Sequence, residues 1–207
     1  MAECAILIAM VAELAHNKKQ KLVTIGVDEV GRGSLAGPVC VAAVAWKNCS
    51  PAKGLADSKK LTAKQRRLMA LVIKNEALAI GIGWVDAPEI DKIGVNFALK
   101  KAALIALEQI KIVDDCQIIV DGRDKLLGDV PAEYIIKADG KIPAVMAASI
   151  IAKVARDSYM CVLGKVHPKY GFDSHAGYGT AKHMAAITEF GACQLHRMSY
   201  SPLKETA

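Results

Sequence analysis

Aromatic side chains are scarce in this chain. Only 5% of its 207 residues are Phe, Trp or Tyr, whereas 53% are hydrophobic, and Ala, Val, Ile and Leu dominate this group. Such an aliphatic composition favours helices packed on a sheet over a sandwich or a barrel. The length fits one domain, with room for a small C-terminal addition and a substantial core. We therefore expect an α/β protein.

The chain also lacks the cysteine and histidine spacings of a disulfide-linked or zinc-bound scaffold. Its six cysteines are scattered at positions 4, 40, 49, 116, 161 and 193, and no C-x-x-C pair occurs. Its five histidines form no H-E-x-x-H or mixed Cys/His ligand pattern, which argues against a zinc site. Free thiols in apolar stretches are typical of a reducing compartment, so we expect a cytoplasmic protein.

Long uncharged hydrophobic runs are missing as well. The apolar segment near the N-terminus, residues 4–15, follows Glu3 and is interrupted by Glu13. A signal peptide would begin with a positive region, and a membrane span would need more length. We interpret this segment as a short helix in an N-terminal extension, residues 1–20, and expect no association with membranes.

Basic residues outnumber acidic ones. The formal net charge is +6 and the isoelectric point is about 9.0, so the surface should attract polyanions in a salt-dependent way. Nucleic acid is the obvious polyanion. Many soluble proteins carry a similar excess without such a partner, so the charge becomes informative only beside a matching site.

The pattern of apolar residues predicts five strands and four helices. The strands are expected at residues 22–28, 39–46, 79–85, 117–121 and 134–138, with the first three antiparallel. Helical periodicity covers residues 62–77, 88–110 and 144–163, and a last helix starts near Thr180 and stops at Gly191.

Acidic residues stand at or just after the ends of three predicted strands. Asp28 and Glu29 close the first, Asp121 closes the fourth, and Asp139 follows the fifth. Taken singly, each fits an ordinary turn residue, because Asp is common at strand ends. If one sheet brings the strands together, the four carboxyl groups converge and raise one another's pKa unless cations neutralise them. Hard oxygen ligands select Mg²⁺ or Mn²⁺, and a pair of such ions can activate water for attack on a phosphodiester.

Short motifs occur along the chain in the order typical of one enzyme family. They are DEVGRG at 28–33, LAGPV at 35–39, DSKKL at 57–61, KAD at 137–139, AASI at 147–150, AKV at 152–154, RD at 156–157 and GYGT at 177–180. Each piece alone is weakly specific. Together, from about residue 22 to Lys204, they make the chain resemble ribonuclease HII.

The resemblance implies a ribonuclease H-like fold, a five-stranded mixed sheet flanked by helices, with a small C-terminal helical segment. It divides the chain into the N-terminal extension at residues 1–20, a catalytic core at residues 21–165, and a segment at residues 166–207 that completes the substrate site. We expect the protein to act as a monomer.

The same resemblance implies an endonuclease that cleaves on the 5′ side of a ribonucleotide and leaves 3′-hydroxyl and 5′-phosphate ends. Its substrates would be RNA–DNA hybrids and DNA duplexes that contain single ribonucleotides. Asp28, Glu29, Asp121 and Asp139 match the family's metal-binding and catalytic carboxylates.

A ribonucleotide in DNA differs from its neighbours by its 2′-hydroxyl. The resemblance assigns the contact with this hydroxyl to the backbone of Gly31, Arg32 and Gly33, where glycines let the main chain approach closely. Tyr178 matches a family tyrosine that stacks on the sugar at the RNA-to-DNA junction. Without the resemblance, a tyrosine between glycines is better explained as a packing residue of a loop.

Basic and polar residues offer further contacts. Lys59 and Lys60 are candidates for binding phosphates, although a run of charges is often only a solvated surface. Ser149, Lys153 and Asp157 recur every four residues, so they share one helix face that must meet water or a site. Lys153 and Asp157 either pair with each other or face the acidic cluster.

Three further positions carry expectations of their own. His183, in the first turn of the last helix, is a candidate for a phosphate contact. Ala176 stands where many family members have a lysine, which should weaken DNA binding somewhat. Tyr200 stands where phenylalanine is usual, a change that should matter little.

Two other functions stay open at this point. A ribonuclease H-like nuclease of the resolvase type would share the acidic cluster but would have no use for the turn at residues 31–33. A non-catalytic hybrid-binding protein would carry the acids for structure alone.

Overall fold

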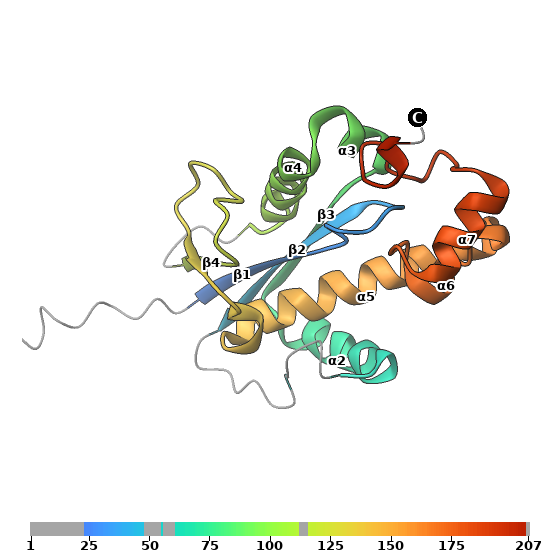
Figure 1. Ribbon diagram of the computed structural model, residues 1–207. Helices are drawn as coiled ribbons and strands as arrows, with labels where there is room; N and C mark the ends of the chain where they lie inside the picture. The colour runs from blue at the N-terminus through green and yellow to red at the C-terminus, as the bar shows by residue number, and fades with distance from the viewer. Residues whose placement is uncertain (1–22, 48–54, 56–60, 112–115, 206–207) are drawn as a thin grey trace, which may run out of the picture.

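The computed structural model describes residues 23–47, 55, 61–111 and 116–205 of the chain. The expected N-terminal helix and the two candidate phosphate ligands Lys59 and Lys60 lie outside these residues. The described residues form one sheet, helices on both of its faces, and a C-terminal group of short elements (Figure 1).

Five strands make up the mixed sheet. They are β1 (Val23–Val30), β2 (Val39–Lys47), β3 (Ala79–Val85), β4 (Cys116–Asp121) and β5 (Glu133–Ile135). Their order across the sheet is β3-β2-β1-β4-β5. The first three strands pair antiparallel, whereas β4 pairs parallel with β1 and β5 parallel with β4. The expected five-stranded mixed sheet is confirmed.

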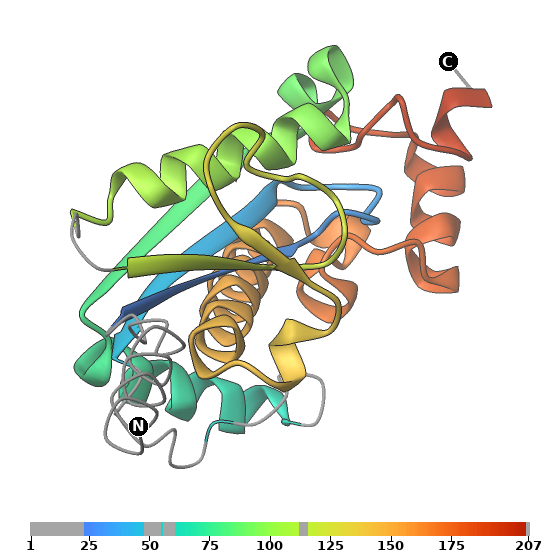
Figure 2. The same cartoon turned by 90° about the vertical axis from the view of Figure 1, so that its left-hand side faces the viewer.

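Helices cover the sheet on both sides. They are α2 (Ala63–Glu76), α3 (Ala87–Ile93), α4 (Val95–Glu108) and α5 (Pro143–Val166). Figures 1 and 2 place α4 on one face of the sheet and α5 with α2 on the other. The start of α2 follows the sequence closely, because Thr62 caps it and exchanges a reciprocal pair of hydrogen bonds with Gln65.

Strand β2 shows how the two faces are filled. Val41 and Ala43 belong to the core beneath α4, while Ala42 and Val44 belong to the core beneath α2 and α5. All four side chains are fully buried. A strand covered on both faces needs apolar residues at every position, which explains the unbroken apolar run in the sequence.

The chain after α5 forms a group of short elements. They are η3 (Pro168–Tyr170), α6 (Phe172–His175), α7 (Ala181–Phe190) and η4 (Leu203–Glu205). Met160 of α5 packs with Tyr170 and Phe172 in a small buried cluster. Of these elements, η3, α6 and α7 gather around the C-terminal end of α5 (Figure 1).

Two element boundaries differ from the prediction. The single helix expected at residues 88–110 is two helices, α3 and α4, separated by Gly94 with φ of 81°. The strand expected at residues 134–138 ends at Ile135, because Lys137 takes a left-handed conformation and a 3-10 turn, η2 (Ala138–Gly140), follows. Asp139 therefore lies in this turn and not directly at a strand end.

Gly26 allows α5 to lie directly against β1. A Cβ at this position would overlap the backbone of Ala144 and Val145 in the first turn of α5. Backbone on both sides leaves no flexible side chain that can move aside. The glycine therefore sets the distance between β1 and the helix that supplies Ser149.

Replacement of Gly26 by Ala should lower the free energy of unfolding by about 1–3 kcal/mol or more, because the added methyl group forces the backbone to shift. Urea denaturation measures this change. Gly140→Ala is a suitable control, since a Cβ there meets nothing within 4 Å, and its effect should stay within about 0.5 kcal/mol. Equal effects of the two substitutions would contradict the close-packing argument.

Candidate active site

The parallel pairing of β1 with β4 brings their carboxyl ends to one edge of the sheet. Val27 pairs with Val120, so Asp28 and Asp121 leave the two strands side by side. Asp139 follows in η2 and is only 4% exposed. These residues and Glu29 line one cavity of about 370 Å³. Acids that are far apart in sequence are therefore neighbours in space.

Most of the other expected site residues line the same cavity. Gly31, Arg32 and Gly33 follow β1, Ser149 and Lys153 come from α5, and Tyr178 comes from the segment after α6. Arg66 of α2 lines it too.

Asp28 lies in an environment that opposes its ionisation. Burial, followed by the charges of Glu29 and Asp121, raises its pKa from 3.8 to about 8. Hydrogen bonds from the Ser149 hydroxyl and from the Glu29 backbone N–H act in the opposite direction. Burial also raises the pKa of Glu29, against the favourable charge of Arg32. The site thus concentrates negative charge where it is poorly solvated.

Asp121 also shapes the backbone that carries Asp139. Its Oδ1 accepts hydrogen bonds from the backbone N–H of Ala138, at 2.7 Å, and of Asp139, at 3.5 Å. The end of β4 is thereby tied to η2. This tie positions the fourth acid even though β5 ends earlier than expected.

The chemistry of this donor set fits a hard divalent cation. No group of three or more His, Cys, Asp and Glu side chains in the described parts of the chain is already arranged to hold an ion. Burial, and after it the charges of Glu29 and Asp121, raises the pKa of Asp28, and a nearby cation would favour its charged form. All the donors are carboxylate oxygens, which suit Mg²⁺ and Mn²⁺.

A buried arginine fixes the glycine turn after β1. The Arg197 guanidinium donates to the carbonyls of Gly31, at 2.7 Å, and Arg32, at 3.1 Å. The Tyr200 hydroxyl donates to the same Arg32 carbonyl at 2.8 Å and accepts from Arg197 at 3.2 Å. The hydroxyl that distinguishes Tyr200 from phenylalanine is therefore engaged with the turn, a contact that phenylalanine could not make.

A second buried arginine acts from α5. Arg156 is fully buried and donates to the Ser34 hydroxyl at 2.7 Å, and that hydroxyl donates to the Gly31 carbonyl at 3.0 Å. Gly31 has φ of 89°, and a Cβ there would overlap the Arg156 side chain. A Cβ at Gly33 would meet nothing within 4 Å, so the protein leaves free space there.

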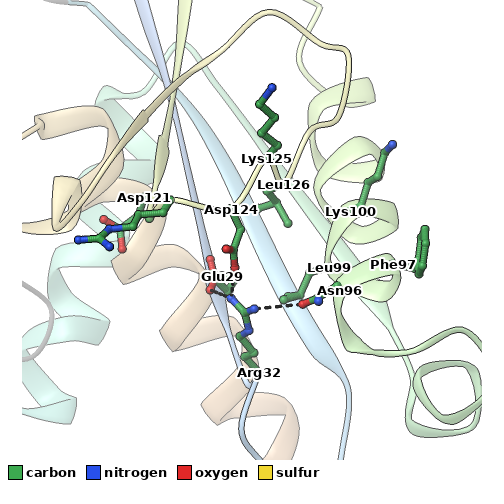
Figure 3. Close-up of a pocket in the computed structure, with 12 residues that line it drawn as sticks. Glu29, Arg32, Asn96, Phe97, Leu99, Lys100, Asp121, Asp124, Lys125 and Leu126 are labelled. Atoms are coloured by element: carbon green, nitrogen blue, oxygen red, sulfur yellow. Dashed lines mark hydrogen bonds and ion pairs between the residues drawn. The ribbon is translucent and has the colours of Figure 1, made fainter.

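The Arg32 side chain links the acidic cavity to a second one. Its guanidinium donates to Asp124 at 2.8 Å and to Asn96 at 3.0 Å, and lies 3.9 Å from Glu29 (Figure 3). The second cavity, of about 430 Å³, also contains Lys100 among its lining residues. No motif or periodicity in the sequence pointed to this cavity.

Tyr178 is held close to positive charge. The Arg156 guanidinium lies 5.5 Å from the centre of its ring, and the Lys153 ammonium lies 5.9 Å away. Lys153 also pairs with Asp157 at 2.8 Å. Both alternatives for Lys153 therefore hold, because it forms the helical ion pair and still lines the cavity.

The expectation for His183 is wrong. Its side chain is fully buried and contacts the Tyr178 carbonyl and the His196 ring, so it is not available to a phosphate. The polar character of a histidine in the first turn of α7 suggested exposure, but the packing of α6 and the C-terminal segment covers it.

A mixed sheet of this order, with carboxylates at the ends of its central parallel strands, defines a nuclease of the ribonuclease H-like class. The family model described as Ribonuclease HII matches residues 25–202, and the chain belongs to that family. It is a metal-dependent endoribonuclease that cleaves RNA in RNA–DNA hybrids.

Curated relatives agree with this assignment. The chain is 44% identical over 178 residues to Ribonuclease HII of Paracidovorax citrulli, which covers 86% of this chain and 74% of the relative. It is 44% identical over 184 residues to Ribonuclease HII of Chromobacterium violaceum, which covers 89% and 93%.

Solved structures agree on the fold. Ribonuclease H2 of Pyrococcus horikoshii superposes with a TM-score of 0.74 at 26% identity, covering 88% of this chain and 96% of the other. Bst-RNase HIII, solved with Mn²⁺, superposes with a TM-score of 0.69 at 22% identity, covering 93% and 71%. Within the described residues, no helix has both the length and the apolar character that a membrane crossing requires.

The raised pKa of Asp28 predicts a stability cost. Without metal, the folded protein keeps a proton on Asp28 up to about pH 8, whereas the unfolded chain loses it near 3.8. The folded state then binds more protons between these values, so metal-free stability falls as pH rises from about 4 to 8. Asp28→Asn removes the ionisable group and should therefore remove this loss.

Thermal melts in a chelator measure the effect. At pH 8 the Asp28→Asn protein should melt about 5 °C or more above the unchanged protein, and this advantage should shrink toward pH 5. Asp129→Asn, at an exposed position on the β4–β5 connection, is the control and should show no such pH dependence. An Asp28→Asn advantage that is equal at both pH values would refute the prediction.

Proposed function

We propose that this enzyme hydrolyses the phosphodiester on the 5′ side of a ribonucleotide, both in RNA–DNA hybrids and at single ribonucleotides embedded in duplex DNA. The products carry 3′-hydroxyl and 5′-phosphate ends. The observation that carries the proposal is a single cavity lined both by four carboxylates and by the glycine turn. A reaction centre and a close-approach backbone surface therefore lie next to each other.

Asp28, Glu29, Asp121 and Asp139 hold the catalytic cations, Mg²⁺ or Mn²⁺. When bound, such ions activate a water molecule and stabilise the leaving oxygen of the phosphodiester. Bst-RNase HIII, which shares the fold, forms a complex with Mn²⁺. The buried, mutually repelling carboxylates of the present chain support the same role for them.

The protein's own polar groups orient the reacting parts. Ser149 donates a hydrogen bond to Asp28 and holds its carboxylate toward the cavity. Lys153, half-buried beside Tyr178, supplies positive charge to a substrate phosphate. Lys59 and Lys60 also bind substrate phosphates.

The turn formed by Gly31, Arg32 and Gly33 recognises the 2′-hydroxyl. Arg197 occupies the carbonyls of Gly31 and Arg32, so their peptide planes are fixed before the substrate arrives. Free space at Gly33 lets a sugar come against the main chain. Preorganised peptide groups lose little entropy on binding, which favours discrimination of a single hydroxyl.

Residues 166–207 act as a C-terminal segment that completes the substrate site after the core at residues 21–165, since they supply Tyr178 to the cavity. We expect the protein to act as a monomer. The duplex continues over the second cavity, where Lys100, Arg123 and Lys125 supply positive charge. Free cysteines at positions 40, 116, 161 and 193 support a cytoplasmic location.

A duplex with one ribonucleotide, compared with its all-deoxy twin, tests the proposed substrate. With Mg²⁺ or Mn²⁺, only the first should be cut, once, on the 5′ side of the ribonucleotide. Equal cutting of both would instead favour a resolvase-type nuclease.

Asp121→Asn tests the role of the carboxylates. It should lower kcat on the single-ribonucleotide duplex at least about 100-fold, because a weakened cation site withdraws several kcal/mol from the transition state. The asparagine oxygen can still accept the Ala138 N–H, so the turn should stay in place. Asp129→Asn serves again as the control, and unchanged cleavage by Asp121→Asn would leave only a hybrid-binding role.

Tyr178→Ala should lower kcat/KM on the single-ribonucleotide duplex about tenfold more than on a long hybrid, because stacking is worth about 1–3 kcal/mol and acts at the RNA-to-DNA junction. The ratio of the two values, measured with the same enzyme preparation, isolates this effect. Tyr159→Ala, a half-exposed α5 residue that pairs with Trp84, is the control and should leave the ratio unchanged. Equal losses on both substrates would contradict the junction role.

A further inference from the structure

A chain of hydrogen bonds runs through the buried core of the C-terminal segment and ends at the backbone of Tyr178. The backbone N–H of Cys193 donates to Nδ1 of His196 at 2.9 Å. Nε2 of His196 lies 3.1 Å from Nε2 of His183, and Nδ1 of His183 lies 3.0 Å from the Tyr178 carbonyl oxygen. We call this chain the histidine relay.

The partners at the two ends of the relay fix where its protons lie. A carbonyl can only accept, so Nδ1 of His183 carries hydrogen and donates to Tyr178. Nε2 of His183 is then the acceptor, and Nε2 of His196 must donate to it. This leaves Nδ1 of His196 free to accept from the Cys193 N–H, so the hydrogen bonds of the relay are satisfied with both rings neutral.

Burial supports the neutral state of both rings. His183 is fully buried and His196 is 2% exposed. Burial lowers the pKa of His183 to about 4 and also lowers the pKa of His196. A proton added to His183 would set two N–H groups against each other at the 3.1 Å contact.

A third histidine holds the other side of the same loop. Nδ1 of His175 accepts the Gly177 N–H at 3.2 Å, while its Nε2 donates to the Tyr170 carbonyl at 2.8 Å. The His175 and His183 rings stack with their centres 4.4 Å apart. The N–H of Gly177 and the carbonyl of Tyr178 are thus both bound to buried imidazoles, one on each side of the peptide bond that joins these residues.

The same loop is hydrogen-bonded to the segment that directly follows the glycine turn. The Gly177 carbonyl accepts hydrogen bonds from the backbone N–H of Leu35, at 2.8 Å, and of Ala36, at 3.2 Å. The Gly177 φ of 80° lies in the region that favours glycine. The backbone of Tyr178 therefore has few ways to relax, and a change at His183 is transmitted directly to the ring that lines the acidic cavity.

We propose that His183 is a positioning residue for Tyr178, and that the donor at its Nδ1, oriented by His196, sets how the tyrosine ring meets the sugar at the RNA-to-DNA junction. This inference rests on the proposed role of Tyr178 in the site. The relay thereby governs preference among substrates, and not the cleavage chemistry itself.

Two amide substitutions at His183 separate positioning from stability. In His183→Asn the amide nitrogen can take the place of Nδ1 and donate to Tyr178, whereas in His183→Gln it lies nearer the place of Nε2 and cannot do so without displacing the loop. Both lose the ring and its packing, so both should lower the melting temperature. A purely structural role would treat the two variants alike.

The measured quantity is the ratio of kcat/KM on the single-ribonucleotide duplex to kcat/KM on a long hybrid. His183→Gln should lower this ratio about fivefold, the typical effect of one lost hydrogen bond, and His183→Asn should stay within about twofold of the unchanged enzyme. Thr188→Ala is the control and should leave the ratio unchanged, because Thr188 is exposed on α7 and its hydroxyl donates to the Met184 carbonyl of the same helix. An unchanged ratio in His183→Gln, or an equal fall in both amide variants, would overturn the proposal.

Tyr178→Ala distinguishes failure of this inference from failure of the proposed function. If Tyr178→Ala lowers the ratio and His183→Gln does not, the relay has no positioning role but the proposed site stands. If Tyr178→Ala leaves the ratio unchanged, the junction role of Tyr178 is lost and the inference with it. If His183→Gln does not fold, His196→Ala provides the test. It removes the donor that keeps Nε2 of His183 unprotonated, so His183 can adopt either tautomer, and the ratio must then fall.

Discussion

The parallel pairing of β1 with β4 is the constraint on which the site depends. It sets Val27 beside Val120 and so brings Asp28 and Asp121, which are far apart in sequence, to the same edge of the sheet. Burial and the neighbouring acids both raise the pKa of Asp28, so its ionisation is opposed in the absence of cations. The buried core on both faces of the sheet must supply the stability that the acids remove. A fold can keep such a destabilising site only when the rest of its packing leaves the protein stable enough to stay folded.

The alternation of side chains along β1 explains why two adjacent carboxylates do different things. Gly26 and Asp28 point toward α5, which lies close enough for the Ser149 hydroxyl to reach the Asp28 carboxylate. Glu29 points to the other face, where it meets Arg32 and helps line the second cavity beside α4. Both carboxylates still line the acidic cavity, because β1 ends there. A substrate that reaches this edge of the sheet is therefore bordered by groups from both layers of helices.

Much of this arrangement could be predicted from the sequence, and the failures have physical causes. Strands buried on two faces leave long apolar runs, and the cap at Thr62 marks the start of α2. The break at Gly94 was missed because helical periodicity continues on both sides of it. The end of β5 was missed because a left-handed lysine, Lys137, has no signature in the sequence. The second cavity depends on tertiary contacts of Arg32 with residues far along the chain, which no local pattern encodes.

Two buried arginines connect the glycine turn with the loop that carries Tyr178. Arg156 donates to the carbonyls of Pro38, Ala36 and Ala176, and Arg197 donates to those of Gly31, Arg32 and Gly37. Burial lowers the pKa of both guanidiniums, but both stay charged. The hydrogen bonds to these carbonyls offset the free-energy cost of removing the charged groups from water. Each carbonyl can then hold only one orientation. Because Arg156 also faces the ring of Tyr178, the glycine turn and the tyrosine loop are braced by the same charged group. The glycine turn and the Tyr178 ring, to which we assign recognition of the sugar, are thus held by shared contacts, and a change in either should affect the other.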